Sequence, residues 1–383
     1  MTEFLDGNQV RLLCNGADYF PALEAAIDQA VREIYLETYI FEYDGTGRRI
    51  AAALKRAAQR GVTTHLLVDG YGGKTLPREA VDEMRAAGVQ VLIYRPTLAK
   101  FRRSSYRRLH RKIAVVDSSI AFVGGINIID DMDTPDQTPP RYDYAVRVEG
   151  PLLPQIHVVV RKLWGLVSWS QLRRRRRRRT LTMSPAAAGD VRAAFVIRDN
   201  IGHRSDIEEA YLEAINNARS EIVLANAYFL PGRQFRQALI QAAARGVRVV
   251  LLLQGRVEYL LLHYATRALY GVFLDAGIEI YEYHRSFMHA KVAVVDGSWA
   301  TVGSSNIDPF SLLLSREANV VVSDADFSAQ LRASLEQAMQ EGSRVVTYAN
   351  WKHQPFYRRL FSWFSYGGVR FLVGVAGYGE RGT

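Results

Sequence analysis

The chain has 383 residues, 48% hydrophobic and 11% aromatic, which is a globular composition and excludes disorder throughout. Its single cysteine, Cys14, excludes an internal disulfide, and the opening MTEFLDGNQV has neither a basic start nor an apolar run, so we expect no export signal and a cytoplasmic protein. The net charge is +10, but seven consecutive arginines at 173–179 supply most of it, and subtracting these seven leaves only about +3.

The first half of the chain predicts alternating strands and helices. Residues 31–41 (VREIYLETYIF) have the composition of a buried strand, and residues 50–70 (IAAALKRAAQRGVTTHLLVDG) predict an amphipathic helix ending near Gly61 and a second strand. A further helix leads to a strand that ends within 86–96 (AAGVQVLIYRP). This βαβαβ order predicts an α/β sandwich with a largely parallel sheet.

The second half repeats this order. Residues 219–229 (RSEIVLANAYF), 235–255 (FRQALIQAAARGVRVVLLLQG) and 275–285 (DAGIEIYEYHR) match the three stretches of the first half. A duplication by itself is compatible with two independent domains side by side. We expect a first repeat at 1–170, an arginine-rich linker at 171–190, a second repeat at 191–345 and a tail at 346–383.

One segment is more similar between the two halves than the rest. Residues 109–128 (LHRKIAVVDSSIAFVGGINI) and 288–307 (MHAKVAVVDGSWATVGSSNI) are identical at 12 of 20 positions without a gap. Side chains alternate along a strand, so His110 and Lys112 project to one side, as do His289 and Lys291. Zinc sites favour His, Cys and carboxylate ligands, and an adjacent ammonium opposes a bound cation, so each pair is suited to an anion.

These residues resemble the phospholipase D superfamily, whose motif His-x-Lys-x4-Asp-x6-Gly-[Gly/Ser]-x-Asn usually occurs twice. The matching residues here are His110, Lys112, Asp117, Gly124, Gly125 and Asn127, then His289, Lys291, Asp296, Gly303, Ser304 and Asn306. The resemblance implies two tandem α/β/α sandwich repeats that are related by a pseudo-two-fold axis and bring both motifs into one site. It also implies a phosphohistidine intermediate without a metal or other cofactor.

The resemblance assigns roles to individual residues. One histidine attacks phosphorus and the other acts as acid and base; family precedent favours His110 as the nucleophile and His289 as acid/base. We expect Lys112, Lys291, Asn127, Asn306 and Ser304 to contact the phosphate. A carboxylate beyond each Gly-x-x-Asn element orients a histidine, and the candidates are Asp143 and Glu317. Asp117 and Asp296 belong to the catalytic motif and are predicted as catalytic residues with it, although a turn role suits them.

Several stretches are similar to bacterial cardiolipin synthases, most closely the B type, among them YAVRVEGP and HYATRALYGVFLDAGIEIYEY. That similarity implies transfer of a phosphatidyl group to the alcohol of a second phospholipid, with phosphatidylglycerol as the expected donor. Arg102, Arg103, Arg107 and Arg108 precede the first histidine and are predicted to attract anionic headgroups. The alternatives are a phospholipase D-type hydrolase, a nuclease, and a non-catalytic membrane-bound scaffold.

The arginine run admits three interpretations: a linker, a nucleic-acid arm, or a tether to an anionic membrane. With a lipid substrate we expect a peripheral protein at the cytoplasmic face of the bacterial membrane and no nucleic-acid partner; the oligomeric state stays open. No run of 18 apolar residues predicts a transmembrane helix. The tail 360–378 (LFSWFSYGGVRFLVGVAGY) suits either a membrane interface or packing on the body of the protein.

Overall fold

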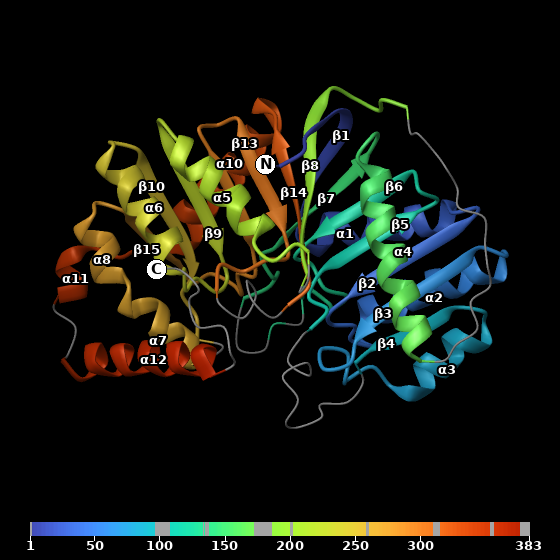
Figure 1. Cartoon of the computed structure of the whole chain (residues 1–383). Coiled ribbons are helices and arrows are strands. Elements are labelled where there is room, and N and C mark those ends of the chain that lie inside the picture. The colour runs from blue at the N-terminus through green and yellow to red at the C-terminus, as the bar shows by residue number, and fades with distance from the viewer. Residues whose placement is uncertain are drawn as a thin grey trace.

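The strands of both halves join into one sheet in this computed structural model, which describes residues 2–95, 108–132, 134, 138–171, 186–199, 202–257, 260–308, 315–352 and 356–375. The linker arginines 173–179 and Arg102, Arg103 and Arg107 lie outside the described residues. Across the described parts of the chain the strand order is β15-β11-β10-β9-β12-β13-β14-β8-β1-β7-β6-β5-β2-β3-β4 (Figure 1).

The first half supplies the strands from β1 to β7. Its elements are β1 (Leu5–Cys14), α1 (Asn15–Gln29), β2 (Glu33–Thr38), α2 (Gly45–Gln59), β3 (Thr63–Asp69), α3 (Arg78–Ala86), β4 (Gln90–Tyr94), β5 (Lys112–Val116), β6 (Ile120–Gly124), β7 (Tyr144–Glu149) and α4 (Leu153–Ser170).

The second half follows the same plan and adds elements at its C-terminus. Its elements are β8 (Val191–Arg198), α5 (Asp206–Asn217), β9 (Glu221–Asn226), α6 (Arg233–Ala244), β10 (Arg248–Gln254), α7 (Leu260–Ala268), α8 (Tyr270–Asp275), β11 (Glu279–Tyr283), β12 (Lys291–Val295), β13 (Trp299–Gly303), β14 (Glu317–Ser323), α10 (Ala325–Gly342), β15 (Ser343–Val345), α11 (Tyr348–Lys352) and α12 (Phe356–Val375).

The order of the strands is symmetric about the β1–β8 pair. Outward from β1 the chain places β7, β6, β5, β2, β3 and β4, and outward from β8 it places the equivalent β14, β13, β12, β9, β10 and β11. The two repeats therefore have the same strand order, read in opposite directions from the β1–β8 pair, as a pseudo-two-fold axis requires. The predicted fold class, two tandem α/β/α repeats, is confirmed.

The expectation of a largely parallel sheet is wrong. Among the described strands, parallel pairing is confined to β2–β3–β4 and β9–β10–β11, and the other neighbours pair antiparallel. The reason lies in the connections. Helical crossovers join the parallel strands, whereas only a tight turn separates β5 from β6 and β12 from β13, and such short connections require antiparallel partners.

Helices cover both faces of the sheet. On one face, α4 and α10 pack over a core that draws strand residues from both repeats, including Ile113 and Val292. On the other face, α1, α2 and α3 cover the first repeat, and α5, α6 and α8 cover the second. This core contains residues of both repeats and holds the two repeats together, because separating them would expose its apolar side chains to water.

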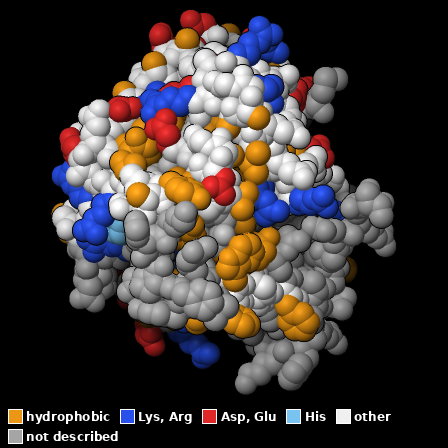
Figure 2. All heavy atoms as spheres, turned by 90° about the vertical axis from the view of Figure 1, so that its left-hand side faces the viewer, with side chains coloured by type: hydrophobic (Ala, Val, Ile, Leu, Met, Phe, Trp, Pro, Cys, Tyr) orange, Lys and Arg blue, Asp and Glu red, His pale blue; other side chains and the backbone are white. Residues whose placement is uncertain are grey.

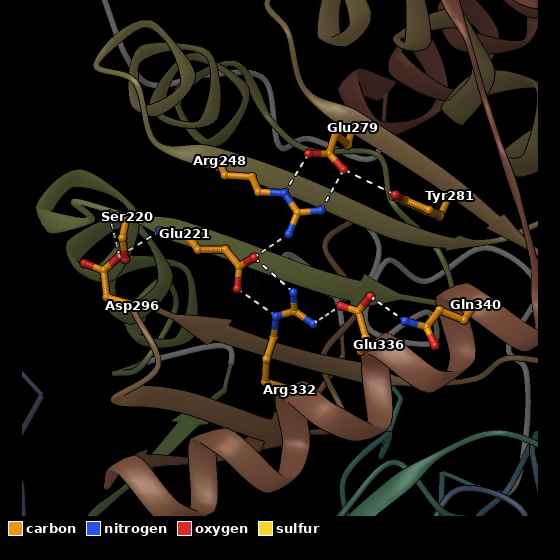
Figure 3. A network of polar contacts seen from close by, with 9 residues as sticks. All are labelled: Ser220, Glu221, Arg248, Glu279, Tyr281, Asp296, Arg332, Glu336 and Gln340. Atoms are coloured by element: carbon orange, nitrogen blue, oxygen red, sulfur yellow. Dashed lines mark hydrogen bonds and ion pairs between the residues drawn. The ribbon is translucent and has the colours of Figure 1, made fainter.

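A network of ion pairs ties together the beginnings of β9, β10 and β11 (Figure 3). Arg248 donates to Glu221 at 2.7 Å and to Glu279 at 2.7 Å, while Arg332 of α10 donates to Glu221 at 2.7 Å and to Glu336 at 2.5 Å. These side chains are partly exposed, so each pair contributes little stability on its own. Their position at the opposite edge from the histidines makes them structural.

Candidate active site

The two histidine segments lie where the repeats meet, and each pairs with backbone of the other repeat. The His110 N–H donates to Arg316 O at 3.0 Å, and the Arg316 N–H donates to Arg108 O at 2.8 Å. In the same way, the His289 N–H donates to Tyr142 O at 2.8 Å, and the Tyr142 N–H donates to Phe287 O at 2.9 Å. These reciprocal backbone bonds fix both histidines on the sheet edge between the repeats.

Each imidazole is held by a carboxylate of the other repeat. His110 Nδ1 lies 2.9 Å from Glu317 Oε1 and 3.1 Å from its Oε2, and His289 Nδ1 lies 2.7 Å from Asp143 Oδ2. An ionised carboxylate only accepts hydrogen bonds, so the Nδ1 atoms carry the protons. The neutral imidazole then presents Nε2 as base or nucleophile, as the triad arrangement of hydrolases does.

Both motif lysines are buried, Lys112 at 3% and Lys291 at 0% exposure. Lys112 Nζ donates to His110 O at 2.6 Å, and Lys291 Nζ donates to His289 O. Burial, together with the charge of Lys291, lowers the pKa of Lys112 to about 7, although Glu317 opposes the shift. Two ammonium groups close enough to repel one another form a site that an anion would stabilise.

Burial also governs the two histidines. It lowers the pKa of His110, which Glu317 partly offsets, and it lowers the pKa of His289 well below the usual value, with Lys291, Lys112 and His110 adding to the shift. Burial raises the pKa of Asp143 to about 6. At neutral pH both imidazoles are therefore uncharged in the unliganded protein. Both Lys112 and Lys291 lower the pKa of each histidine, as expected of side chains that lie close together.

The Gly-[Gly/Ser]-x-Asn elements differ between the repeats. Ser304 Oγ donates to Glu317 Oε2 at 2.5 Å, so this hydroxyl supports the carboxylate instead of pointing to a phosphate oxygen as expected. At the equivalent Gly125, an added Cβ would overlap Asp143. Asn127 Oδ1 accepts from the Ile40 N–H at 3.1 Å, which leaves its NH2 group as donor, and Asn306 is buried at the matching position.

The motif aspartates lie at the far end of their strands, about 16 Å along β5 or β12 from the lysines at 3.3 Å per residue. Asp117 accepts backbone N–H groups from Val31, Arg32 and Glu33 at 2.8 to 2.9 Å. Asp296 accepts equivalent bonds from 219–221. These contacts favour the turn role over the predicted catalytic one, because the aspartates tie each turn to the beginning of β2 or β9.

Arg108 is the one member of the predicted headgroup-attracting group within the described residues. Its guanidinium lies 3.7 Å from the buried Asp69 carboxylate and 5.5 Å from the centre of the Tyr71 ring. This arginine thus contacts Asp69 and Tyr71 of its own repeat, and its headgroup role stays a prediction. The other three arginines of that group lie outside the described residues.

Sequence reasoning missed the aromatic rings beside the histidines. Tyr39 meets His110 edge to face with centroids 5.0 Å apart, and Phe287 stacks on His289 at 6.1 Å. Arg141 lies 5.2 Å from the Phe287 centroid and also lowers the pKa of His289. The available signal was the position in the sequence: Tyr39 lies near the end of the strand predicted at 31–41, and Phe287 lies two residues before His289.

Within the described ranges, no group of three or more His, Cys, Asp or Glu side chains is arranged to hold a metal ion. Among the same residues, no helix combines the length and the apolar character needed to cross a bilayer.

The strand order and the two crossed histidine–carboxylate pairs define a phospholipase D-like protein. The chain belongs to the family described as "Cardiolipin synthase, PLD-like domain", which matches residues 23–132 and 211–339. These two segments contain both His-x-Lys motifs and Glu317.

Individual relatives agree with this membership. The chain is 43% identical over 332 residues to "Cardiolipin synthase B" of Escherichia coli strain K12, covering 86% of this chain and 80% of the relative. A probable cardiolipin synthase of Bacillus subtilis is 30% identical over 363 residues, or 93% and 72% of the two chains. The fold also matches the crystal structure of phosphatidylserine synthase of Haemophilus influenzae, with TM-score 0.75, 14% identity and coverage of 97% and 96%.

Proposed function

We propose that this protein is a phosphatidyltransferase of the cardiolipin synthase type. It transfers the phosphatidyl group of one phospholipid, phosphatidylglycerol, to a hydroxyl of a second phosphatidylglycerol, and releases glycerol. The observation that carries the proposal is the pair of crossed contacts, His110 with Glu317 and His289 with Asp143, because they build two oriented imidazoles into one buried, cationic site. Relatives named for cardiolipin synthesis support the choice of substrate.

The first step forms a covalent intermediate. Nε2 of His110 attacks phosphorus, the P–N bond forms, and the P–O bond to the glycerol headgroup breaks. His289, protonated in the substrate complex, gives its Nε2 proton to the leaving alkoxide. The low pKa of His289 in the unliganded protein favours this transfer, since a weakly basic imidazole releases its proton readily, and the anionic phosphodiester supplies the charge that allows protonation.

The second step reverses the roles. Nε2 of His289 removes a proton from the hydroxyl of the acceptor lipid, its oxygen attacks phosphorus, and the P–N bond to His110 breaks. Lys112 and Lys291 stabilise the charge on the equatorial oxygens throughout, together with the NH2 groups of Asn127 and Asn306. Each phosphatidyl transfer thus consumes two molecules of phosphatidylglycerol and yields one cardiolipin and one glycerol.

We infer that the protein works as a peripheral enzyme on the cytoplasmic face of a bacterial membrane, where its anionic lipid substrates lie. The support is the lipid substrate that the family implies, together with a buried site of paired cations that suits an anionic headgroup.

The test is to incubate the purified protein with vesicles of labelled phosphatidylglycerol and identify the product. Labelled cardiolipin with an equal amount of glycerol is the expected result, and the His110→Ala variant should form neither. Phosphatidic acid in place of cardiolipin would indicate a hydrolase. Turnover of DNA without turnover of lipid would indicate a nuclease, and a protein that binds vesicles but turns over nothing would be a scaffold.

A further inference from the structure

The outer face of α12 is aromatic. Phe361, Trp363, Phe364 and Phe371 are exposed by 43%, 55%, 71% and 70%. Large aromatic side chains bury 150–250 Å² each when they pack, so four of them exposed on one helix amount to a substantial apolar surface. Contiguous exposed apolar surface of this kind marks a place where a protein meets a partner or a membrane.

The inner face of the same helix is the more polar one. Ser362 and Ser365 are each only 3% exposed, and Val369, also 3% exposed, packs with the core of the second repeat. A helix on the surface of a water-soluble protein places its apolar side chains inward and its polar ones outward. Here serines face inward and phenylalanines outward, so water is a poor environment for the outer face.

The helix is attached to the body of the protein. It lies along α7, and the Phe361 ring meets the Tyr264 ring of α7 edge to face at 4.8 Å (Figure 1). Arg236 of α6 donates to Tyr366 OH at 3.3 Å. Leu260 and Leu261, which begin α7, are exposed by 54% and 53%. We call Leu260, Leu261, Phe361, Trp363, Phe364 and Phe371 the apolar surface.

In Figure 2, hydrophobic side chains occur over much of the face shown, including its lower half. A few lysine and arginine side chains border them on the same face. Aromatic residues next to cations are the composition that proteins use at the level of lipid headgroups.

This surface lies at the edge of the sheet that holds the active site. β10 ends at Gln254, and α7 follows it. β12 lies two strands away in the order β10-β9-β12 and runs in the opposite direction, so its first residue, Lys291, lies at the same edge of the sheet. In the first repeat, Tyr71 follows the end of β3 at the same edge, is 46% exposed, and has Lys74 Nζ 5.3 Å from its ring centre. Both repeats therefore expose apolar groups at the edge of the sheet where the histidines lie.

We propose that the apolar surface docks the enzyme on a phospholipid bilayer, with α12 lying in the plane of the interface and its aromatic rings among the headgroups and first acyl carbons. This inference rests on the proposed function, because a lipid substrate has to reach the histidines from a bilayer. α12 lies in the interface and does not cross it, in keeping with the absence of a spanning helix from the described residues. Docking through α12 turns the active-site edge towards the lipid.

The occupant is a bilayer instead of a second copy of the chain for two reasons. A bilayer lies where the substrate is, and the active-site edge has to remain open to it, which a protein partner seated over α7 and α12 would hinder. Moreover, exposed phenylalanine and tryptophan beside glycine, as at Gly367 and Gly368, suit a fluid interface that does not demand complementary shape.

Vesicle flotation of the full chain tests the proposal, with vesicles of phosphatidylethanolamine and phosphatidylglycerol. The double variant Phe364→Ser/Phe371→Ser should lower the partition coefficient by about tenfold or more at both low and high salt, because apolar insertion is not screened. The matched control is Val31→Ser/Val158→Ser, which removes two exposed apolar side chains, 75% and 63% exposed, away from this surface. Its partition coefficient should equal that of the wild type.

A second measurement locates the contact. Brominated lipids should quench the tryptophan fluorescence of the wild type, and the Trp363→Phe variant should lose most of that quenching while keeping its thermal stability. Unchanged partition of the phenylalanine double variant would overturn the proposal, as would equal quenching in Trp363→Phe. A lower oligomeric mass of the double variant with unchanged partition would show that a second copy covers the surface.

Activity separates this inference from the proposed function. In mixed detergent micelles, where no docking on a bilayer is needed, the phenylalanine double variant should synthesise cardiolipin at the wild-type rate, and on vesicles it should be slower by the same factor as its partition. If the wild type makes no lipid product in either system, the proposed function fails, while flotation still decides whether the apolar surface binds a bilayer.

Discussion

Glu317 Oε1 lies 2.9 Å from His110 Nδ1, although 207 residues separate the two in the chain. The reciprocal pair, Asp143 with His289, spans 146 residues. Neither repeat therefore orients its own histidine, and each depends on the other for a working imidazole. A single repeat could supply a His-x-Lys pair but not the carboxylate that fixes its tautomer.

The crossed pairing makes Glu317→Gln a direct test of orientation. The amide keeps the shape of the side chain but can turn its NH2 towards Nδ1, which favours the wrong tautomer of His110. We expect kcat to fall by about 10²- to 10⁴-fold with little change in KM, by analogy with amide substitution of a triad carboxylate. Steady-state kinetics on phosphatidylglycerol in mixed micelles measures this. The Arg248→Met variant, at the opposite edge of the sheet, is the control and should keep its kcat.

The glycine and serine at the second position of the Gly-[Gly/Ser] elements should not be interchangeable. Gly125→Ser places a Cβ against Asp143 and pushes that carboxylate away from His289, so we expect kcat to fall about 100-fold, the effect of a misplacement of about 1 Å. Ser304→Ala removes one hydrogen bond to Glu317 and should cost less, about 10-fold. Kinetics of both variants, with thermal melts to verify folding, would contradict this account if the two losses were equal.

The covalent intermediate distinguishes the two histidines. With lipid labelled at phosphorus, a quench in alkaline denaturant, in which the P–N bond is stable, should trap labelled His289→Ala protein, because His110 can still attack, whereas His110→Ala should trap none. Leaving-group departure without an acid is slow, so a donor with a good leaving group such as p-nitrophenol gives the clearest signal. Label in His110→Ala and not in His289→Ala would exchange the two roles.

The features that depend on local sequence pattern could be predicted. The duplication, the alternating strands and helices, and the same-side placement of His110 and Lys112 all follow from periodicity and spacing. The predicted parallel pairing holds only for the βαβ part of each repeat. The three-residue turn at 117–119 makes β5 and β6 antiparallel, whatever pattern precedes it. The apolar runs alone could not reveal this.

The cross-repeat contacts could not be predicted in the same way. Candidate carboxylates were identifiable by their position after the motif, but which histidine each one meets depends on how the two repeats approach, and that is set by the shared core under α4 and α10. The buried pair of Arg111 and Glu37, with Arg111 Nη2 3.0 Å from Glu37 Oε1, was equally hidden. Arg111 lies between the two motif residues, where nothing marked it as buried.

The pH dependence of kcat/KM should be limited on the alkaline side by Lys112. Its pKa of about 7 means that the ammonium is present below this pH and is lost as the pH rises through it. We therefore expect kcat/KM, which reports the free enzyme, to fall above about pH 7, and kcat to fall only at higher pH, because a bound phosphodiester stabilises the ammonium. Lys112→Arg keeps its charge, so its lower activity should show no such alkaline limb. The same limb in the arginine variant would assign it to another group.

Asp117 should contribute to stability and not to chemistry. Its carboxylate accepts three backbone N–H groups at the beginning of β2, and the residue has a φ of 52°, a left-handed conformation that Asp tolerates better than most residues. Asp117→Ala loses these bonds at a partly exposed site and should lower the free energy of unfolding by about 1–3 kcal/mol, as measured by urea denaturation. Its kcat at a temperature well below its melting point should stay within about twofold of the wild type, because the carboxylate lies about 16 Å along β5 from Lys112. Asp117→Asn, which retains one acceptor oxygen, should be intermediate in stability. A large loss of kcat in a fully folded Asp117→Ala protein would return this aspartate to the catalytic residues.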